Sequence, residues 1–207
     1  MDDVITGEDG IARCWWGDAP PDYRAYHDDE WGMPVADDLR LFEKLSLEGF
    51  QAGLSWLTIL RKRDAFRRAF AGFDFERVAQ FGERDVARLL ADASIVRHRG
   101  KIEAVINNAA RAVELVAQKG SLAAYVWGFE PPAPHAALRD RDALGELSQT
   151  PDSRALAKDL RSRGWRFVGP TTTYAFMQAM GLVNDHLASC AAHAAVERAR
   201  ASFTRPS

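Results

Sequence analysis

Cysteine, positive charge and long apolar runs are all scarce in this chain of 207 residues. Two cysteines exclude a disulfide-rich scaffold. Although 47% of the residues are hydrophobic, no uninterrupted run approaches the roughly 20 residues that cross a bilayer, so we expect a globular protein without a membrane partner. Lys and Arg total 27 against 29 Asp and Glu, and the net charge of −2 excludes nucleic-acid binding by bulk attraction. No internal repeat and no convincing alternating strand appear, which favours an all-α fold.

The two cysteines are each accompanied by a histidine. Cys14 is followed by His27 after twelve residues, and His186 precedes Cys190 by four, the spacing that places two side chains on one helical face. If the four meet, they form a closed Cys₂His₂ site for one structural zinc ion, joining the first segment of the chain to the last. The spacing alone leaves two unrelated buried thiols as an equal alternative. A disulfide is less favoured, because the acidic N-terminus has no apolar signal segment and predicts a reducing, cytoplasmic location.

Apolar periodicity predicts helices over most of the chain. They cover a segment that begins at Asp37 or Asp38, then 51–70, 101–119, 153–163, 170–181 and a last helix that Asp185 caps and that carries His186 and Cys190. The proline-rich stretch 129–150 breaks the pattern. We interpret it as a surface loop within a single domain over 1–207, in which 1–12 and 195–207 are peripheral.

A glycine-bracketed turn, GWRFVGPT over 164–171, separates two of these helices. This arrangement is typical of a helix-hairpin-helix, here about 153–181, whose second helix presents free backbone N–H groups and a positive dipole end to a phosphate. An ordinary helical hairpin with a glycine cap is the alternative. The basic cluster Arg97, Arg99 and Lys101 could add phosphate contacts, or could be an exposed, solvated helix start.

Four blocks of sequence resemble the 3-methyladenine DNA glycosylase I family, the constitutive bacterial alkylation-repair enzymes. They are YRAYHDDEWG at 23–32, LEGFQAGLSW at 47–56, RHRGKI at 97–102, and the segment from FVG at 167–169 to GLVNDH at 181–186. The resemblance runs from about Arg13 to Cys190 and implies a helix-hairpin-helix DNA glycosylase fold. It also implies a zinc clasp at Cys14, His27, His186 and Cys190.

The resemblance further implies a pocket for a flipped base. A glycosylase takes the damaged nucleotide out of the duplex and grips the flat base between aromatic faces. Tyr26 and Trp56 match the base-binding aromatics of the family, and Tyr23 matches another pocket-lining tyrosine. Glu48 matches the glutamate that contacts the base; we expect it to act chiefly in recognition and electrostatics, since N3-alkylated adenine is cationic and normal adenine is not. Core packing is expected for four other tryptophans, Trp16, Trp31, Trp127 and Trp165.

The implied reaction is hydrolytic release of N3-methyladenine from alkylated double-stranded DNA, which leaves an abasic site; 3-methylguanine stays open as a second substrate. Related glycosylases place a catalytic aspartate near the position that is Asn184 here. Asn184 is uncharged, but a cationic base leaves as a neutral molecule, so little general-base help is needed. No lysine lies in that region, which predicts a monofunctional enzyme without a strand-cleaving step.

Backbone contacts to DNA are expected at the hairpin and at the basic cluster. The expected residues are Gly164, Gly169, Thr171, Thr172, Arg97, Arg99 and Lys101. With so few cations, binding should be weak and salt-sensitive. No obligate protein partner is evident and we expect a monomer. Two other classes stay open: a hydrolase that uses zinc catalytically, which a fourth protein ligand disfavours, and a damage-binding protein without activity.

Overall fold

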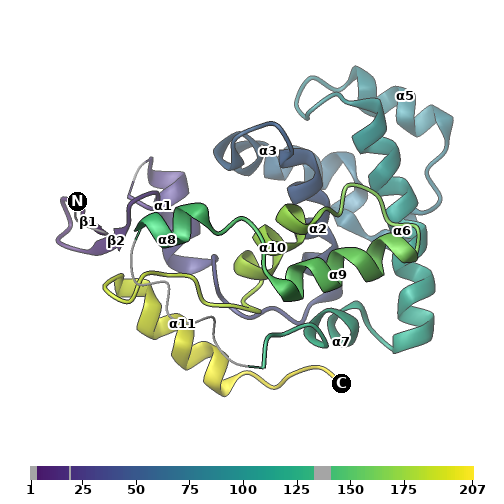
Figure 1. Ribbon diagram of the computed structural model, residues 1–207. Helices are drawn as coiled ribbons and strands as arrows, with labels where there is room; N and C mark the ends of the chain where they lie inside the picture. Colours follow the sequence, from purple (N-terminus) through teal and green to yellow (C-terminus); the bar gives the residue numbers. More distant parts are fainter. Residues whose placement is uncertain (1–3, 19, 133–140) are drawn as a thin grey trace.

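Helices make up most of the molecule (Figure 1), and the expectation of a mainly helical fold is confirmed. The computed structural model describes residues 4–18, 20–132 and 141–207. Its helical elements are α1 (Pro21–Asp29), α2 (Asp38–Gln51), α3 (Trp56–Ala69), the 3₁₀ turn η1 (Ala71–Phe73), α4 (Phe75–Val78), α5 (Glu83–Ala91), α6 (Arg99–Lys119), α7 (Leu122–Trp127), α8 (Arg141–Glu146), α9 (Pro151–Ser162), α10 (Pro170–Ala179) and α11 (Ala191–Ser202). None of the described helices is long and apolar enough to cross a membrane.

The all-α prediction is wrong at the N-terminus, where two short strands pair. β1 (Val4–Thr6) lies antiparallel to β2 (Ala12–Cys14), with Val4 opposite Cys14. Three residues per strand are too few to show an alternating pattern in the sequence. Arg13 on β2 is buried and paired with Asp9, Asp18 and Asp28. The hairpin is therefore fastened to α1, and it holds Cys14 in place.

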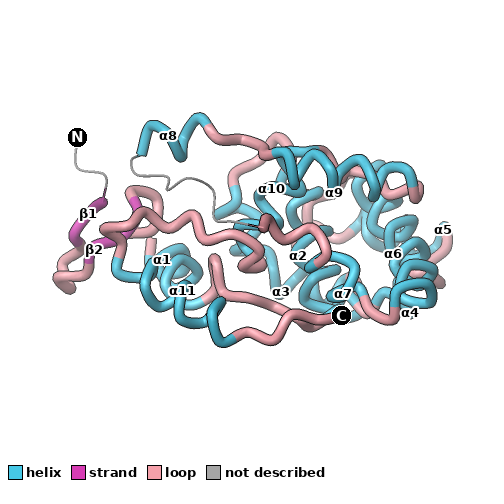
Figure 2. The backbone as a smooth tube through the Cα atoms, turned by 60° about the horizontal axis from the view of Figure 1, so that its bottom comes forward, coloured by secondary structure: helices cyan, strands magenta, loops and turns pink. Residues whose placement is uncertain are grey.

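Helix α2 lies in the middle of the molecule (Figure 2), where it contacts α3, α6, α7 and α10. Its side chains Phe42 and Phe50 are fully buried, and Phe50 packs against Phe66 of α3 with ring centroids 4.6 Å apart. Asp37 caps α2 by accepting a hydrogen bond from the Arg40 N–H at 2.8 Å. An aromatic core thus fixes the helix that carries Glu48.

The predicted helix over 51–70 is wrong at its start. Helix α2 continues to Gln51, a turn with Gly53 at φ +82° follows, and α3 begins at Trp56. The physical reason is the N-cap at Ser55, whose Oγ accepts a hydrogen bond from the Thr58 N–H at 3.2 Å. Leu54 is exposed on this turn. The change places Trp56 at the first position of a helix, beside the end of α2.

The last predicted helix is also misplaced. Residues 181–190 form turns, and α11 begins only after Cys190, so His186 and Cys190 do not share a helical face. Asp185 caps nothing. Its buried carboxylate accepts hydrogen bonds from the Tyr174 hydroxyl at 2.5 Å and from the Gln178 amide at 2.9 Å. A carboxylate used in this way is not available to start a helix.

The C-terminal residues, expected to be peripheral, pack against the rest of the chain. Val196 is buried, the Phe203 ring lies 4.5 Å from that of Trp127, and Arg200 pairs with Glu130 at 3.0 Å. Of the proline-rich stretch 129–150, residues 133–140 lie outside the described residues, and 141–146 form α8 rather than a loop.

Candidate functional site

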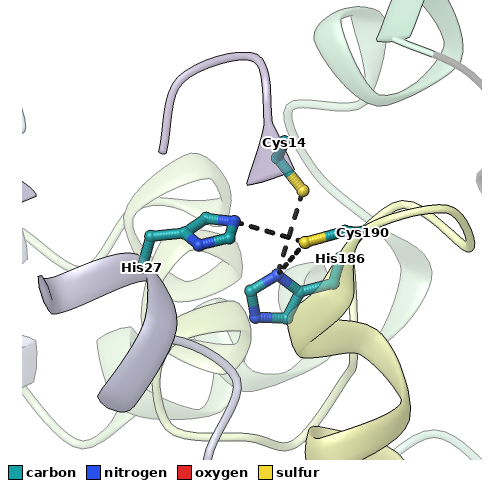
Figure 3. Close-up of side chains that lie close together, drawn as sticks. All are labelled: Cys14, His27, His186 and Cys190. Atoms are coloured by element: carbon teal, nitrogen blue, oxygen red, sulfur yellow. Dashed lines mark hydrogen bonds between the residues drawn. The ribbon is translucent and has the colours of Figure 1, made fainter. Parts of the chain in front are cut away.

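Four side chains from three separate segments meet in a buried cluster (Figure 3). Cys14 comes from the end of β2, His27 from α1, and His186 with Cys190 from the turns before α11. The Cys190 sulfur lies 3.6 Å from His27 Nε2 and 3.6 Å from His186 Nδ1, and the Cys14 sulfur lies 3.8 Å from His186 Nδ1. All four ligand atoms lie within 4.8 Å of one another, so together they could hold a metal ion.

The outer nitrogens of both histidines are engaged, which leaves the inner nitrogens for the cluster. His27 Nδ1 lies 2.8 Å from Asp28 Oδ1, and His186 Nε2 lies 3.0 Å from the Trp31 carbonyl oxygen. A donated hydrogen bond at the outer nitrogen selects the tautomer whose inner nitrogen is a free ligand. The Cys14 thiol and the two imidazoles lower the pKa of Cys190, which favours the thiolate that a metal requires.

Close packing around His27 requires a glycine at position 17. A Cβ atom added to Gly17 would lie 2.3–2.4 Å from atoms of the His27 ring. The adjacent Trp16 ring contacts His27 edge-on at 4.9 Å and Trp31 edge-on at 4.8 Å. Trp16 and Trp31 therefore form a wall that the cluster supports from one side.

The opposite side of this wall faces a cavity of about 270 Å³. It is lined mainly by aromatic side chains, namely Trp15, Trp16, Tyr23, Tyr26, Trp31 and Trp56, together with Glu48, Gln51, Leu147, Ala175 and Gln178. The structure thus brings together Tyr23, Tyr26, Glu48 and Trp56. Trp16 and Trp31 pack in or against the core, as expected, but they also line the cavity, which the sequence did not predict. Their position near Cys14 and His27 in the sequence was the available signal, because the Cys–His cluster brings both segments together.

Glu48 is buried in this cavity wall and is only half satisfied. Its Oε1 lies 2.7 Å from the ammonium of Lys44, one helical turn earlier on α2. Its Oε2 has no hydrogen-bond partner among the described residues. Lys44 also donates to the Tyr26 hydroxyl at 2.9 Å and lies 3.1 Å above the centre of the Trp56 ring. Burial lowers the pKa of Lys44 to about 8, while burial and the Glu48 charge raise the pKa of Tyr26. Lys44 was missed because a Lys and a Glu four residues apart are typical of exposed helix faces.

The glycine-bracketed turn between α9 and α10 is held firmly from α6. Gly164 adopts φ +83°, which ends α9, and Gly169 precedes the first turn of α10. Asn107 donates to the Gly164 carbonyl at 2.8 Å, and Asn108 forms two hydrogen bonds, of 2.8 and 2.9 Å, with the backbone of Arg166. The first-turn N–H groups of α10, which a helix leaves unpaired, include those of Thr171 and Thr172. The turn is thus a fixed element and not a mobile loop.

Comparison with known proteins identifies the family. The family model for methyladenine glycosylase matches residues 15–193. DNA-3-methyladenine glycosylase 1 of Escherichia coli K12 is 46% identical over 87% of this chain and 96% of its own length. A crystal structure of 3-methyladenine DNA glycosylase I superposes with a TM-score of 0.81 at 50% identity, covering 87% of this chain and 99% of that one. The enzyme of Staphylococcus aureus, solved to explain 3-methyladenine recognition, gives a TM-score of 0.81 at 37% identity and covers 87% and 96%.

The chain belongs to the methyladenine glycosylase family. Its enzyme class is that of the DNA glycosylases, which hydrolyse N-glycosyl bonds. The four sequence blocks that resemble this family all lie at the features described above: the cluster, the cavity, the start of α6 and the turn before α10.

The three basic residues expected to contact DNA have different surroundings in the structure of this glycosylase. Arg97 and Arg99 are exposed at the start of α6, where Arg99 lies 3.2 Å from Glu103. Lys101, in contrast, is buried and donates to the carbonyl oxygens of Phe50 at 2.9 Å and Ala52 at 2.6 Å. Its phosphate contact stays a prediction, and the ammonium already binds the C-terminal end of α2, where the negative end of the helix dipole lies.

Asn184 of the glycosylase faces α11 and does not line the cavity. Its side-chain amide donates to the Glu197 carboxylate at 2.7 Å and to the His193 carbonyl at 3.2 Å. The described residues that line the cavity include one carboxylate, Glu48, and no lysine. Charge inside the cavity is therefore concentrated at Glu48.

Proposed function

We propose that this glycosylase removes N3-methyladenine from alkylated double-stranded DNA by hydrolysis, leaves an abasic site, and does not cleave the strand. The observation that carries the proposal is the buried, unpartnered oxygen of Glu48 in the wall of a cavity lined by aromatic side chains. The names of relatives support it: both the Escherichia coli and the Haemophilus influenzae relatives are DNA-3-methyladenine glycosylases.

The flipped base is gripped by aromatic faces and recognised by one carboxylate. Tyr23 and Tyr26 are stacked at 22° with centroids 6.3 Å apart, and Trp56 lies 5.4 Å from Tyr26. Stacking contributes roughly 1–3 kcal/mol per base. Glu48 Oε2 accepts a hydrogen bond from the amine or ring edge of the base, and its charge favours a cationic purine over a neutral one. Glu48 thus acts chiefly as a recognition residue.

The chemical step uses the charge that the lesion already carries. The bond between sugar and N3-methyladenine breaks with its electron pair moving to the base, which leaves as a neutral molecule. Water adds to the sugar and loses a proton to solvent. Because the leaving group is good, gripping and desolvating the base supply most of the acceleration. The absence of lysine from the described cavity lining supports a monofunctional enzyme, since a lyase step requires an amine at the sugar.

We infer that the buried cluster binds one structural zinc ion. Two thiolates and two imidazoles are a donor set that zinc prefers, and four protein ligands leave no open position for water. This argues against catalysis at the metal. The ion would join β2, α1 and the segment before α11, and would hold Trp16 and Trp31 behind the base.

The helix-hairpin-helix interpretation applies to α9, the 163–169 turn and α10. In this proposal Gly164, Gly169, Thr171 and Thr172 hold a DNA phosphate through backbone N–H groups, and Arg97 and Arg99 contribute charge. The chain acts as a monomeric single domain. The rigid Asn108 contacts support such a site, because a fixed turn loses little entropy when it binds a phosphate.

Base release from N-methylated duplex DNA tests this function. Free bases are separated by chromatography for the wild type and for Glu48→Gln and Trp56→Ala, with Glu114→Gln, an exposed carboxylate on α6, as control. We expect 3-methyladenine from the wild type and the control, and at least tenfold less from the other two; 3-methylguanine is measured in the same run. No release from folded, zinc-loaded wild type would reject the proposal in favour of a damage binder without activity.

A further inference from the structure

A second, smaller cavity lies behind the base cavity, and one wall separates them. Tyr26 and Trp56 line both cavities, whereas Glu48 lines only the first and Lys44 only the second. Lys44 is therefore placed on the far side of the Tyr26–Trp56 wall from the base. The Glu48–Lys44 ion pair therefore joins a residue of the first cavity to a residue of the second.

Lys44 is the one cation that the described residues pair with Glu48. The two side chains are 7% and 4% exposed, and the Nζ–Oε1 distance is 2.7 Å. Two other cations that line the rear cavity have carboxylate partners of their own: Arg63 binds Glu30, and Arg67 binds Glu43 at 2.8 Å. The ammonium is held further by Tyr26 and by the face of Trp56. Its position is thus fixed from three sides.

A carboxyl group buried among aromatic rings takes up a proton unless a positive charge lies next to it. A protonated Glu48 would lose the negative charge that distinguishes a cationic base from a neutral one. While the cavity is empty, the positive charge has to come from the protein. It also has to come from behind, because a cation in front would occupy the position of the base.

We propose that Lys44 is a positioning residue, which keeps Glu48 ionised and oriented from behind the cavity wall so that one carboxylate oxygen stays free for the base. This inference rests on the proposed function of Glu48. Lys44 itself touches neither the base nor the sugar. The unpartnered Oε2, the 2.7 Å contact at Oε1 and the separation of the two cavities all agree with this role.

The surroundings of Lys44 set the pH range in which it can act. Tyr26 and Glu30 face it from the end of α1, and Arg63 from α3; burial, Glu48, Arg63 and Glu30 are, in that order, the influences on its pKa. Charged residues of the same rear cavity are Arg40, Glu43 and Arg67. Burial lowers the pKa of Lys44 to about 8, so the ammonium is present at neutral pH and is lost above pH 8.

The first test measures the ionisation of Glu48 directly and needs no DNA. Glutamate labelled with ¹³C at the side-chain carboxyl is titrated by NMR in full-length, metal-loaded protein, and the Glu48 signal is assigned by its loss in Glu48→Gln. In Lys44→Met, which keeps the length of the side chain without its charge, we expect the midpoint to rise by at least one pH unit. Lys44→Arg should restore it, and Lys119→Met, at an exposed position on α6, should leave it unchanged. An unchanged midpoint in folded Lys44→Met would overturn the proposal.

The second test asks whether activity follows that ionisation. Base release by Lys44→Met should fall below that of the wild type as the pH is lowered through the new midpoint of Glu48, and it should recover as the pH rises through that midpoint. A loss of activity that does not depend on pH would indicate a packing defect and would overturn the positioning role. The two tests fail separately: if the wild type releases no base but the midpoint moves, the proposed function is wrong and the role of Lys44 in ionisation stands.

Discussion

The Cys–His cluster lies behind the Trp16–Trp31 wall of the base cavity and the Glu48–Lys44 pair lies at its Tyr26–Trp56 wall, and these two buried polar groups differ in completeness. In the cluster, all four donor atoms face one another and the outer histidine nitrogens are satisfied by Asp28 and Trp31. The Glu48–Lys44 pair leaves Oε2 without a partner. A buried polar atom without a partner costs free energy, and a base bound at Oε2 would remove this cost. We therefore expect the closed cluster to stabilise the fold and the incomplete pair to bind a ligand.

The largest effect is expected from opening the closed cluster. Cys190→Ser removes a thiolate that the proposed zinc ion needs. Without the ion, the other three donor side chains are buried polar groups that repel one another or lack a partner. We expect the free energy of unfolding to fall by at least about 5 kcal/mol and the melting temperature by more than about 10 °C. The melting temperature is measured by thermal unfolding and the bound metal by mass spectrometry. His193→Ala, which changes a histidine outside the cluster, is the control. A variant that melts like the wild type would show that the cluster does not hold the fold together.

A smaller effect should follow from disturbing the cluster without removing a donor. Gly17→Ala places a Cβ 2.3–2.4 Å from atoms of the His27 ring, so the ring has to shift from its place in the cluster. We expect a loss of about 2–3 kcal/mol, the usual cost of overpacking, and weaker metal retention in a chelator titration. Gly82→Ala is the matched control, because a Cβ there meets open space at a negative φ. Equal effects of the two variants would contradict the close packing at Gly17.

The Trp16–Trp31 wall between the cluster and the base cavity is tested by Trp16→Leu. Trp16 lines the cavity and touches His27, so its loss should weaken base binding and loosen the cluster together. We expect kcat/KM for base release to fall about 30-fold, near 2 kcal/mol. Trp127→Leu, which alters a buried ring away from the cavity, should lower the melting temperature without changing KM. If Trp16→Leu changed stability alone, the wall would have no part in binding the base.

The sequence predicts an element well where its neighbouring residues determine it, and poorly where contacts between distant residues do. The α6 helix and its end at Gly120 follow from periodicity and a glycine cap, and they are found as expected. The His186–Cys190 spacing favoured a helix, but the buried role of Asp185 prevents one, and such a role depends on tertiary contacts with Tyr174 and Gln178. The ligand set was predicted nevertheless, because it rests on residue types and on the family resemblance.

The sequence predicted the aromatic residues and the Glu48 of the cavity, but it did not predict which charged side chains are buried around them. Lys44 and Glu48 look like an exposed pair in the sequence, and Lys101 looks like a free basic residue. Burial changes the role of both lysines: one becomes the partner of Glu48 and the other binds the end of α2. Burial of a charged side chain cannot be read from its neighbours along the chain, since packing between helices decides it.

The smallest expected effect is a pH dependence that belongs to the incomplete site. Burial lowers the pKa of Lys44 to about 8, whereas in the unfolded chain it stays near the ordinary value of 10.5. Between pH 8 and 10.5 the unfolded chain therefore binds a proton that the folded protein has released, and raising the pH favours the folded state. Below pH 8 both states hold the proton, and the contribution is constant.

The wild type should consequently gain about 1 kcal/mol of unfolding free energy relative to Lys44→Met between pH 8 and pH 9. Urea unfolding at the two pH values measures the difference. Tyr26, whose pKa burial raises, acts in the opposite direction only above pH 10, where its unfolded form ionises first. Staying below pH 9.5 and taking the difference from Lys44→Met removes this contribution. Identical pH slopes for both proteins would mean that the ammonium of Lys44 is not buried behind Tyr26 and Trp56. The contrast between the closed and the incomplete site would then lose its electrostatic basis.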